Sequence, residues 1–455
     1  MLALTNFWQA LFDAPYLFIA IIAAIGCLYF TIFKSYNYSL FDPMLIWLLF
    51  TSFGTADVFF MYSVGMVSLY HLTSFCLTQG FFIAGFLVFR PIKKVYPCKL
   101  YKQSSGDDRM IGILAALSGL IYVACQLTTY MALGVSLLKE SRLMTFAEGG
   151  GLGVLGRVTM ITSQIFVFTL LYRYSGGTKK TMPVMLYDAI VLLFVLVSGI
   201  LSGSKSTFLV IIYIMFYFSL FFQRSELLQD YLTRIRKYQY RLFCFAFVAA
   251  MSIISFELTR AFEGGETTSP LFQLLVRFLQ SGDVFMFAYP DNVLDLMAYD
   301  NPFKVIFADL LGLTRVFSWD ELPIALGNQL YRFHYDSDLP MGPNPLHNVF
   351  GLFYFGYLGS LIYSFCVGMI FSFIRNRLLF TVSSTPTGGL LYVLLSINLF
   401  AIVTDISLSM YYLDNLLLVA PVLIIISCIV SRIDSGGMMW PLLKQASLPN
   451  TSQIE

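Results

Sequence analysis

The sequence predicts an all-α integral membrane protein, a polytopic bundle of about eleven transmembrane helices with one large outward loop that carries amphipathic helices. The first observation is composition, since 58% of the residues are hydrophobic and only 12% are charged. Soluble domains carry roughly twice that charge. The second is the recurrence of apolar runs of roughly 17–25 residues along the chain. The third is a regular alternation of basic and basic-poor connections between those runs.

The apolar runs place the expected spans in chain order. Two of them, at residues 243–256 and 389–403, are short for a hydrocarbon core of about 30 Å. The runs also define one long polar stretch, at residues 257–346, which separates the earlier spans from the last three. The expected spans cover residues 14–33, 41–62, 67–89, 110–133, 152–171, 183–203, 207–222, 243–256, 347–373, 389–403 and 416–430.

The distribution of lysine and arginine predicts the orientation of the spans. Basic residues gather in every second connection, for example at residues 90–109, 224–241 and 375–377, and again in the tail. Because basic connections stay in the cytoplasm, we expect the tail inside and both the N-terminus and the large loop outside. The resulting parts are the first eight spans, the large loop, the last three spans and a cytoplasmic tail, at residues 1–256, 257–346, 347–431 and 432–455.

The large loop has two segments with helical periodicity. Residues 271–279 and 303–313 place phenylalanines on one face of each segment. Amphipathic helices of this kind lie along the boundary between membrane and water. We therefore expect parts of the loop to rest on the outer surface of the membrane.

The loop ends in a stretch that favours a fixed histidine. Residues 342–348 read GPNPLHN, and the two prolines stop any helix that runs in from the loop. Asn348 is suited to cap the apolar helix that follows, which we expect to run on through Gly356. His347 would then present a titratable imidazole at the rim of the apolar layer. The alternative is a histidine that merely sits at the water boundary.

Three cations lie on the side that the positive-inside rule disfavours. Lys205 occupies a very short turn, Arg260 follows the eighth span, and Arg277 lies on the first amphipathic segment. Cations together with backbone N–H groups at helix ends bind phosphate well. The alternative for each is a side chain that only reaches for lipid headgroups. Three such cations with His347 on one face favour the phosphate site.

Acidic residues inside the spans have a simpler explanation. Asp57 and Asp188 each fall within an apolar run, and hydrogen bonding between helices accounts for such residues. Asp57 lies near the outer half of its span, where the same outward cavity is the alternative. Asp188 lies toward the cytoplasmic side, where a loop cation can pair with it.

The order of these parts resembles the bacterial O-antigen polymerase (Wzy) family, within the O-antigen polymerase and ligase superfamily. Residues 345–350 read PLHNVF and residues 356–359 read GYLG, similar to the family's His-Asn…Gly-x-x-Gly signature. Residues 202–206 read SGSKS, similar to its Gly-Ser-Arg-Gly turn, although Lys205 stands where the family usually has arginine. The resemblance covers roughly the sixth to ninth spans and the loop.

The resemblance implies a glycosyltransferase of the bacterial inner membrane with its active site facing the periplasm. His347 would be the catalytic base, and Lys205, Arg260 and Arg277 would bind the substrate diphosphate. Asp283 and Asn348 are candidates for binding sugar. Donor and acceptor would be undecaprenyl-diphosphate-linked oligosaccharides, with membrane lipid and a chain-length regulator protein as further partners. No nucleic acid, cofactor or metal is expected.

The polymerase reading predicts transfer of a lipid-linked glycan chain onto an incoming lipid-linked repeat unit. The related alternative is an O-antigen ligase, which would transfer the chain to lipid A–core. A lipid-linked oligosaccharide flippase or transporter is the alternative from another class. A flippase needs polar and cationic residues along a path through the spans, whereas the cations here gather at one face.

Overall fold

The computed structural model describes most of the chain as helix. The described residues are 2–39, 41–92, 105–138, 153–175, 180–202, 206–222, 237, 241, 276–335 and 341–435. Within these ranges there is no β-strand, and eight helices are long and apolar enough to cross a membrane. The expected α-helical membrane class is confirmed at that level. The expected span at residues 243–256 lies outside the described residues.

The chain divides into two compact units that interleave along the sequence. Unit 1 comprises residues 1–97, 238–381 and 395–414, and unit 2 comprises residues 98–237, 382–394 and 415–455. The division runs through α18 (Pro386–Asn398) and α19 (Ile406–Ser435), so each of these helices contributes to both units.

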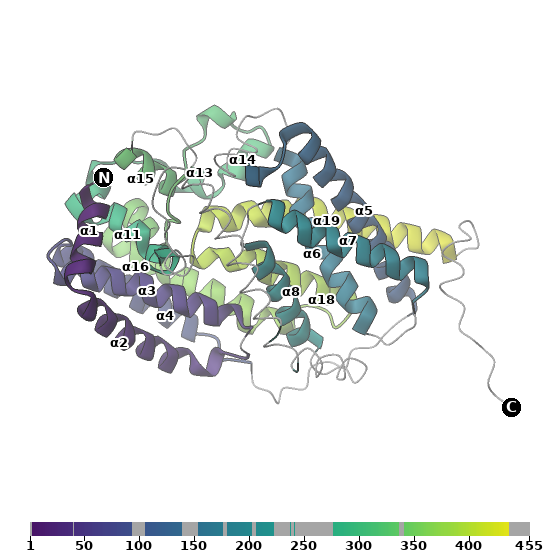
Figure 1. The fold of residues 1–455 in the computed structure, drawn as a ribbon, viewed down its shortest axis with the longest axis horizontal. Helices are drawn as coiled ribbons and strands as arrows, with labels where there is room; N and C mark the ends of the chain where they lie inside the picture. Colours follow the sequence, from purple (N-terminus) through teal and green to yellow (C-terminus); the bar gives the residue numbers. More distant parts are fainter. Residues whose placement is uncertain are drawn as a thin grey trace. The chain divides into compact units, whose positions relative to one another are not determined.

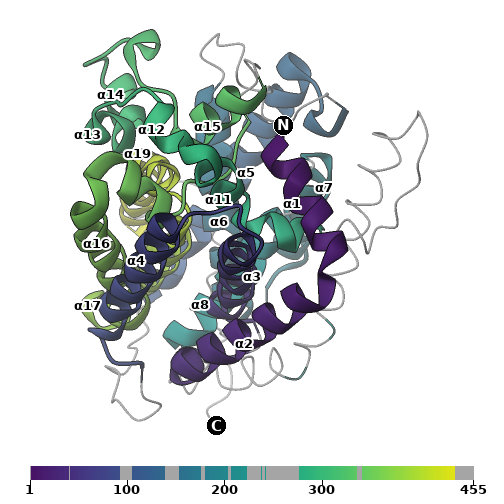
Figure 2. The ribbon, with the colours of Figure 1, turned by 90° about the vertical axis from the view of Figure 1, so that its left-hand side faces the viewer.

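Unit 1 contains the N-terminal helices and the whole described part of the large loop. α2 packs on α3, and α4 packs along α16 (Figures 1 and 2). The long helices are α1 (Leu2–Asp13), α2 (Pro15–Phe33), α3 (Pro43–Ser63), α4 (Leu69–Leu87) and α16 (His347–Asn376). The loop contributes η5 (Gln280–Gly282), α11 (Asp283–Ala288), η6 (Pro290–Asn292), α12 (Val293–Leu296), α13 (Pro302–Ile306), α14 (Ala308–Leu313), η7 (Trp319–Glu321) and α15 (Leu326–Tyr335).

The starts of the unit 1 helices follow from local chemistry. Pro15 and Pro43 occupy the first turns of α2 and α3, where a missing N–H costs nothing. The Asp42 side chain caps α3 by accepting a hydrogen bond from the Met44 N–H at 2.9 Å. Ser68 caps α4 by accepting from the His71 N–H. These signals fix the helix boundaries to within a residue or two of the predicted runs.

Two glycines allow α4 and α16 to pack with their backbones in contact. A Cβ atom on Gly85 would lie 2.1 Å from the Phe365 carbonyl oxygen, and one on Gly368 would lie 2.1 Å from the Phe82 carbonyl oxygen. Small residues at helix crossings serve this purpose in membranes, where dispersion contacts replace the hydrophobic effect between helices. The pair therefore holds the two helices in a fixed register.

α16 reverses direction at Gly356, which corrects the expectation of one helix running through this glycine. Gly356 has φ 67° and ψ −174°, a conformation that is open to glycine and strained for other residues. The His347 Nδ1 atom lies 3.1 Å from the Ser364 hydroxyl, although the two residues are 17 positions apart. A straight helix would separate them by about 25 Å. Residues 347–355 therefore fold back against residues 357–376.

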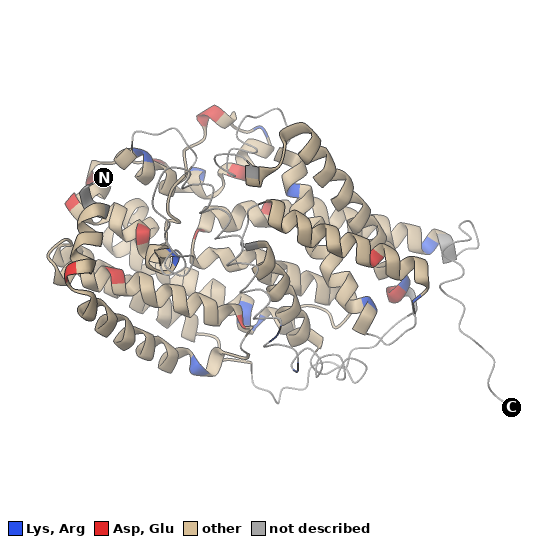
Figure 3. Ribbon diagram, in the orientation of Figure 1, with Lys and Arg blue, Asp and Glu red and all other residues tan. Residues whose placement is uncertain are grey.

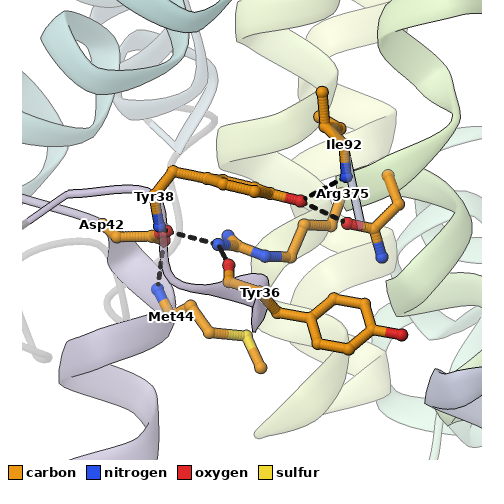
Figure 4. A network of polar contacts seen from close by, with 7 residues as sticks. Tyr36, Tyr38, Asp42, Met44, Ile92 and Arg375 are labelled. Carbon is orange, nitrogen blue, oxygen red and sulfur yellow. Dashed lines mark hydrogen bonds and ion pairs between the residues drawn. The ribbon is translucent and has the colours of Figure 1, made fainter. Parts of the chain in front are cut away.

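One end of unit 1 is held by a buried polar network (Figure 4). Arg375 forms an ion pair with Asp42 and donates to the Tyr36 carbonyl oxygen at 2.6 Å. The Tyr38 hydroxyl donates to Asn376 Oδ1 at 3.1 Å and accepts from the Ile92 N–H at 2.8 Å. The connection after α2, the end of α4 and the end of α16 therefore meet, as alternating spans require. The remaining charged residues drawn lie mainly near helix ends and in connections (Figure 3).

Unit 2 is built around a pair of long helices. α5 packs along α6, and α8 also packs on α6. Its helices are α5 (Ser105–Leu133), α6 (Gly153–Ser175), α7 (Met182–Leu201) and α8 (Ser206–Phe222), joined by the adjoining parts of α18 and α19. The Arg173 Nη1 atom lies 2.9 Å from Asp188 Oδ1, which confirms the predicted pairing of Asp188 with a loop cation.

The amphipathic segments of the loop are confirmed in part. The expected helix at 303–313 is broken at Phe307 into α13 and α14, and Phe303 and Phe307 are both exposed. Of the segment at 271–279, only residues 276–279 are described, and they form a helical turn. Phe278 of that turn stacks on Phe53 of α3 with ring centroids 5.4 Å apart. The second segment thus retains an exposed apolar side, as the sequence predicts.

Candidate functional site

The structure fixes the His347 side chain from two sides. The imidazole stacks on the Phe82 ring with centroids 4.5 Å apart and planes 10° from parallel. Its Nδ1 atom lies 3.1 Å from the Ser364 hydroxyl. Only 6% of the residue is exposed. The ring therefore has one orientation, and no described residue bonds to its Nε2 atom.

His347 is buried among the helices of unit 1. Its bonding partner Ser364 follows Tyr357 by seven residues, about 10 Å along a helix. Phe82 likewise lies well inside α4. The reversal at Gly356 places residues 347–355 inside the bundle, together with the non-helical residues 341–346 that precede them. This is why the histidine sits between helices and not at their ends.

Asn348 does not cap the helix, so that prediction is wrong. Leu346 occupies the N-cap position, and no side chain caps the helix there. Asn348 Nδ2 instead donates to the Thr78 hydroxyl at 2.8 Å and lies 3.4 Å from Gln79 Oε1. An amide inside an apolar bundle needs such partners, and α4 supplies them. Asn348 therefore anchors the start of α16 beside His347.

The loop that leads to His347 is packed tightly against α15. A Cβ atom on Gly327 would lie 1.8 Å from the Pro343 carbonyl oxygen, and one on Gly342 would lie 2.1 Å from the Gly327 carbonyl oxygen. The two backbones thus touch at a pair of glycines. This contact determines where the chain enters α16 and so where the imidazole is placed.

Arg277 and Asp283 are the two predicted site residues at the beginning of the described loop. Arg277 is exposed on the helical turn at residues 276–279, and Asp283 begins α11. Burial raises the pKa of Asp283 to about 7, while the Val284 N–H and the Arg277 charge act to lower it. A carboxyl group with a pKa near neutrality is suited to exchanging a proton under working conditions.

The predicted ring of cations is only partly described. Lys205 and Arg260 lie outside the described residues. Among the residues that are described, no hydrogen bond or ion pair joins Arg277 to His347. The structure does bring His347 and Asn348 together with side chains from α4 and from the second half of α16.

Sequence reasoning missed the partners that hold this site. Ser364 could not be identified, because only the reversal at Gly356 brings it to His347. Thr78 and Phe82 fall in an apolar run with no distinguishing pattern. A glycine in the middle of an apolar run was the one available signal, and it is equally common in straight membrane helices.

Comparison of the chain with protein-family models, with curated proteins and with solved structures found no match.

Proposed function

We propose that the protein is an O-antigen polymerase, a glycosyltransferase that extends an undecaprenyl-diphosphate-linked glycan. In this proposal it works at the periplasmic face of a bacterial inner membrane. The observation that carries it is the imidazole of His347, held by Ser364 and Phe82 at the start of a helix that folds back into the bundle. The motif similarity of the segment supports the same reading.

The chemistry requires a base and a set of cations. The donor already has a diphosphate leaving group, so developing negative charge needs stabilisation and not a strong acid. Lys205, Arg260 and Arg277 are the residues proposed to supply it. The acceptor hydroxyl must lose a proton as it attacks the anomeric carbon, and a neutral imidazole suits that role.

The base must be the Nε2 atom of His347. Nδ1 lies against the Ser364 hydroxyl, so the productive tautomer has Nδ1–H donating to that oxygen. Nε2 then keeps a free lone pair for the acceptor proton. Ser364 acts as the orienting partner, a role that a third group has in many acid–base pairs.

The alternatives remain a ligase that uses lipid A–core and a flippase. The flippase is less well supported, because the buried Asp188 and Arg375 are both engaged in ion pairs. Polymerase and ligase share the proposed site chemistry. A deletion strain distinguishes them, since a lost polymerase leaves a single repeat on the core and a lost ligase leaves none.

The test is the lipopolysaccharide ladder of a deletion strain carrying variants of two of the three histidines. We expect His347→Gln to abolish chain extension at normal membrane abundance, since loss of a general base costs about 10²–10⁴ in rate. The matched control is His334→Gln, because His334 Nε2 lies 2.8 Å from the Phe287 carbonyl oxygen and a glutamine amide can donate there. A normal ladder from His347→Gln would remove the base assignment.

A further inference from the structure

The first half of α16, which carries His347, ends on the side of unit 1 that the sequence predicts to face outward. Tyr70, near the start of α4, contacts Tyr357 just after the reversal, with ring centroids 5.5 Å apart. Phe82, which stacks on His347, lies about three turns further along α4. His347 therefore lies at the inner end of this half-helix. Tyr354 lies at its outer end, about 10 Å further along the helix and on the same face.

Tyr299 of the large loop is bonded to that outer end. Helical bonding is interrupted at Gly356, so carbonyl groups of the preceding turn lose their usual N–H partners. The Tyr299 hydroxyl donates to the Tyr354 carbonyl oxygen at 2.9 Å and satisfies one of them. The rings of Tyr299 and Tyr354 have centroids 5.9 Å apart, and 62% of Tyr299 remains exposed. The bond thus fixes an exposed aromatic ring beside the segment that holds the proposed base.

Asp300 adds a carboxylate next to this ring. It follows Tyr299 in the chain and is half-buried. Gln329 of α15 donates from Nε2 to the Ile324 carbonyl oxygen at 2.6 Å, and the same atom lies 3.5 Å from Asp300 Oδ2. Among the described residues, no cation forms an ion pair with Asp300. An ionised carboxyl group is an acceptor only, so the partners that suit it are donors such as hydroxyl groups.

An exposed aromatic ring with a few fixed polar groups beside it is a common composition of small-ligand sites. The carboxylate repels phosphate, whereas sugar hydroxyls can donate to it and the ring can cover the apolar C–H face of a sugar. We propose that Tyr299 and Asp300 form a saccharide subsite for a neutral sugar of the acceptor glycan. The glycan would then lie at the outer end of the half-helix whose inner end carries His347.

Binding of released glycan tests the subsite without any assay of transfer. The probe is the surface polysaccharide of the source strain, cut from its lipid by mild acid so that it has no diphosphate. Saturation-transfer NMR with the purified full-length protein measures its affinity. We expect Tyr299→Ala and Asp300→Asn each to weaken binding about tenfold, because one removes the ring and the other the charged acceptor. The controls are Phe303→Ala and Asp295→Asn, an exposed ring and an exposed carboxyl group of the same loop, which should bind as the wild type does.

Tyr299→Phe separates contact with the sugar from a structural role. It removes the hydrogen bond to the Tyr354 carbonyl oxygen and keeps the ring, so its affinity should stay close to that of the wild type. Binding as weak as that of Tyr299→Ala would mean that the tyrosine only holds the helix end, and would overturn the subsite. Absence of binding by the wild type, or equal binding by the wild type, Tyr299→Ala and Asp300→Asn, would also overturn it. Tyr299 would then be an aromatic residue of the membrane interface.

The place of the subsite in the reaction rests on the proposed function and has its own readout. In membranes supplied with lipid-linked repeat units, a higher concentration of these units should restore chain extension by Tyr299→Ala but not by His347→Gln. Extension by Tyr299→Ala that equals the wild type at every concentration would overturn the role in the reaction. A deletion strain that keeps a normal ladder would refute the proposed function, while the binding measurements would still decide whether the subsite exists.

Discussion

Two buried aspartates belong to α3. Asp42 is at its N-cap, Asp57 is in its second half, and the two carboxyl groups have different surroundings. Asp42 accepts hydrogen bonds from the Met44 and Tyr38 N–H groups and forms an ion pair with Arg375. Asp57 is equally buried and has no counter-ion among the described residues, and the backbone N–H of Gly282 is the donor that acts on it. The same residue type on the same helix therefore has a counter-ion at one end and, among the described residues, none at the other.

The difference separates a structural charge from a candidate functional one. A buried ion pair with further hydrogen bonds is satisfied and holds its surroundings in place. A buried carboxyl group without a counter-ion has a free-energy cost that the fold must offset elsewhere, and such groups concentrate at functional sites. We therefore expect substitutions near Asp42 to lower the amount of folded protein in the membrane. Substitutions near the large loop should leave that amount unchanged and abolish the polysaccharide product.

The largest expected effect is that of Arg375→Ala. It leaves Asp42 buried without its counter-ion, which costs about 3–5 kcal/mol in similar pairs. The protein should be lost from the membrane fraction or melt at a much lower temperature, as measured by immunoblot and by thermal unfolding in detergent. The control is Arg377→Ala, an exposed neighbour whose guanidinium lies 5.8 Å from the Phe89 ring, expected to cost less than about 1 kcal/mol. Equal abundance of the two variants would contradict the structural role of the pair.

Lys205→Gln should leave the protein in the membrane at normal abundance but remove its product. If the lysine binds the diphosphate, loss of one charge-assisted contact costs about 1.5–3 kcal/mol in binding. The ladder should disappear at normal abundance, and Lys205→Arg should retain much of it because the charge is kept. Lys304→Gln is the control, since that loop lysine lies over the Phe317 ring at 4.3 Å and has no proposed contact with substrate. A normal ladder from Lys205→Gln would favour headgroup contact instead.

The sequence predicted the helices well because length and hydropathy determine them locally. The apolar runs at α2, α3 and α7 match the observed helices closely. The pairing of Asp188 with Arg173 was also accessible, because the two residues flank one short connection. Such features depend on near neighbours, and near neighbours are visible in a sequence.

Contacts between distant residues were not accessible. Arg375 reads as an ordinary basic residue of a cytoplasmic connection, whereas it pairs with a residue 333 positions away. The prediction for Asn348 failed for a related reason, because its amide donates a hydrogen bond to Thr78 of α4 and does not bond within its own helix. The depth of His347 depends on a single backbone conformation at Gly356, which no pattern in the apolar run reveals.

Gly356→Ala tests whether that conformation places the imidazole. A Cβ atom on Gly356 would meet nothing within 4 Å, so any cost is conformational, at φ 67°. Such a residue is strained by about 1–3 kcal/mol. Chain extension should fall more than abundance, because residues 347–355 shift against Ser364. The control is Gly26→Ala, which also has open space and lies in ordinary helix, where alanine should be neutral or slightly stabilising. Similar behaviour of the two variants would exclude strain at the reversal.

The smallest expected effect is that of Asp188→Asn in unit 2. Asp188 is a third buried carboxyl group that can be compared with Asp42 and Asp57. Asp188 Oδ1 accepts from Arg173 and Oδ2 accepts from the Tyr174 hydroxyl at 3.0 Å. Arg173 is 11% exposed, against 1% for Arg375, so water can replace part of the lost contact. Asparagine keeps one acceptor, and the expected loss is about 1 kcal/mol of unfolding free energy.

A double-mutant cycle with Arg173→Gln measures the coupling directly. We expect the two single variants and the double variant to melt within a narrow range below the wild type, with normal abundance and a normal ladder. A loss as large as that of Arg375→Ala would show that exposure does not set the cost of breaking these pairs. The distinction between the Asp42 end and the other buried carboxyls would then have to rest on hydrogen bonding alone.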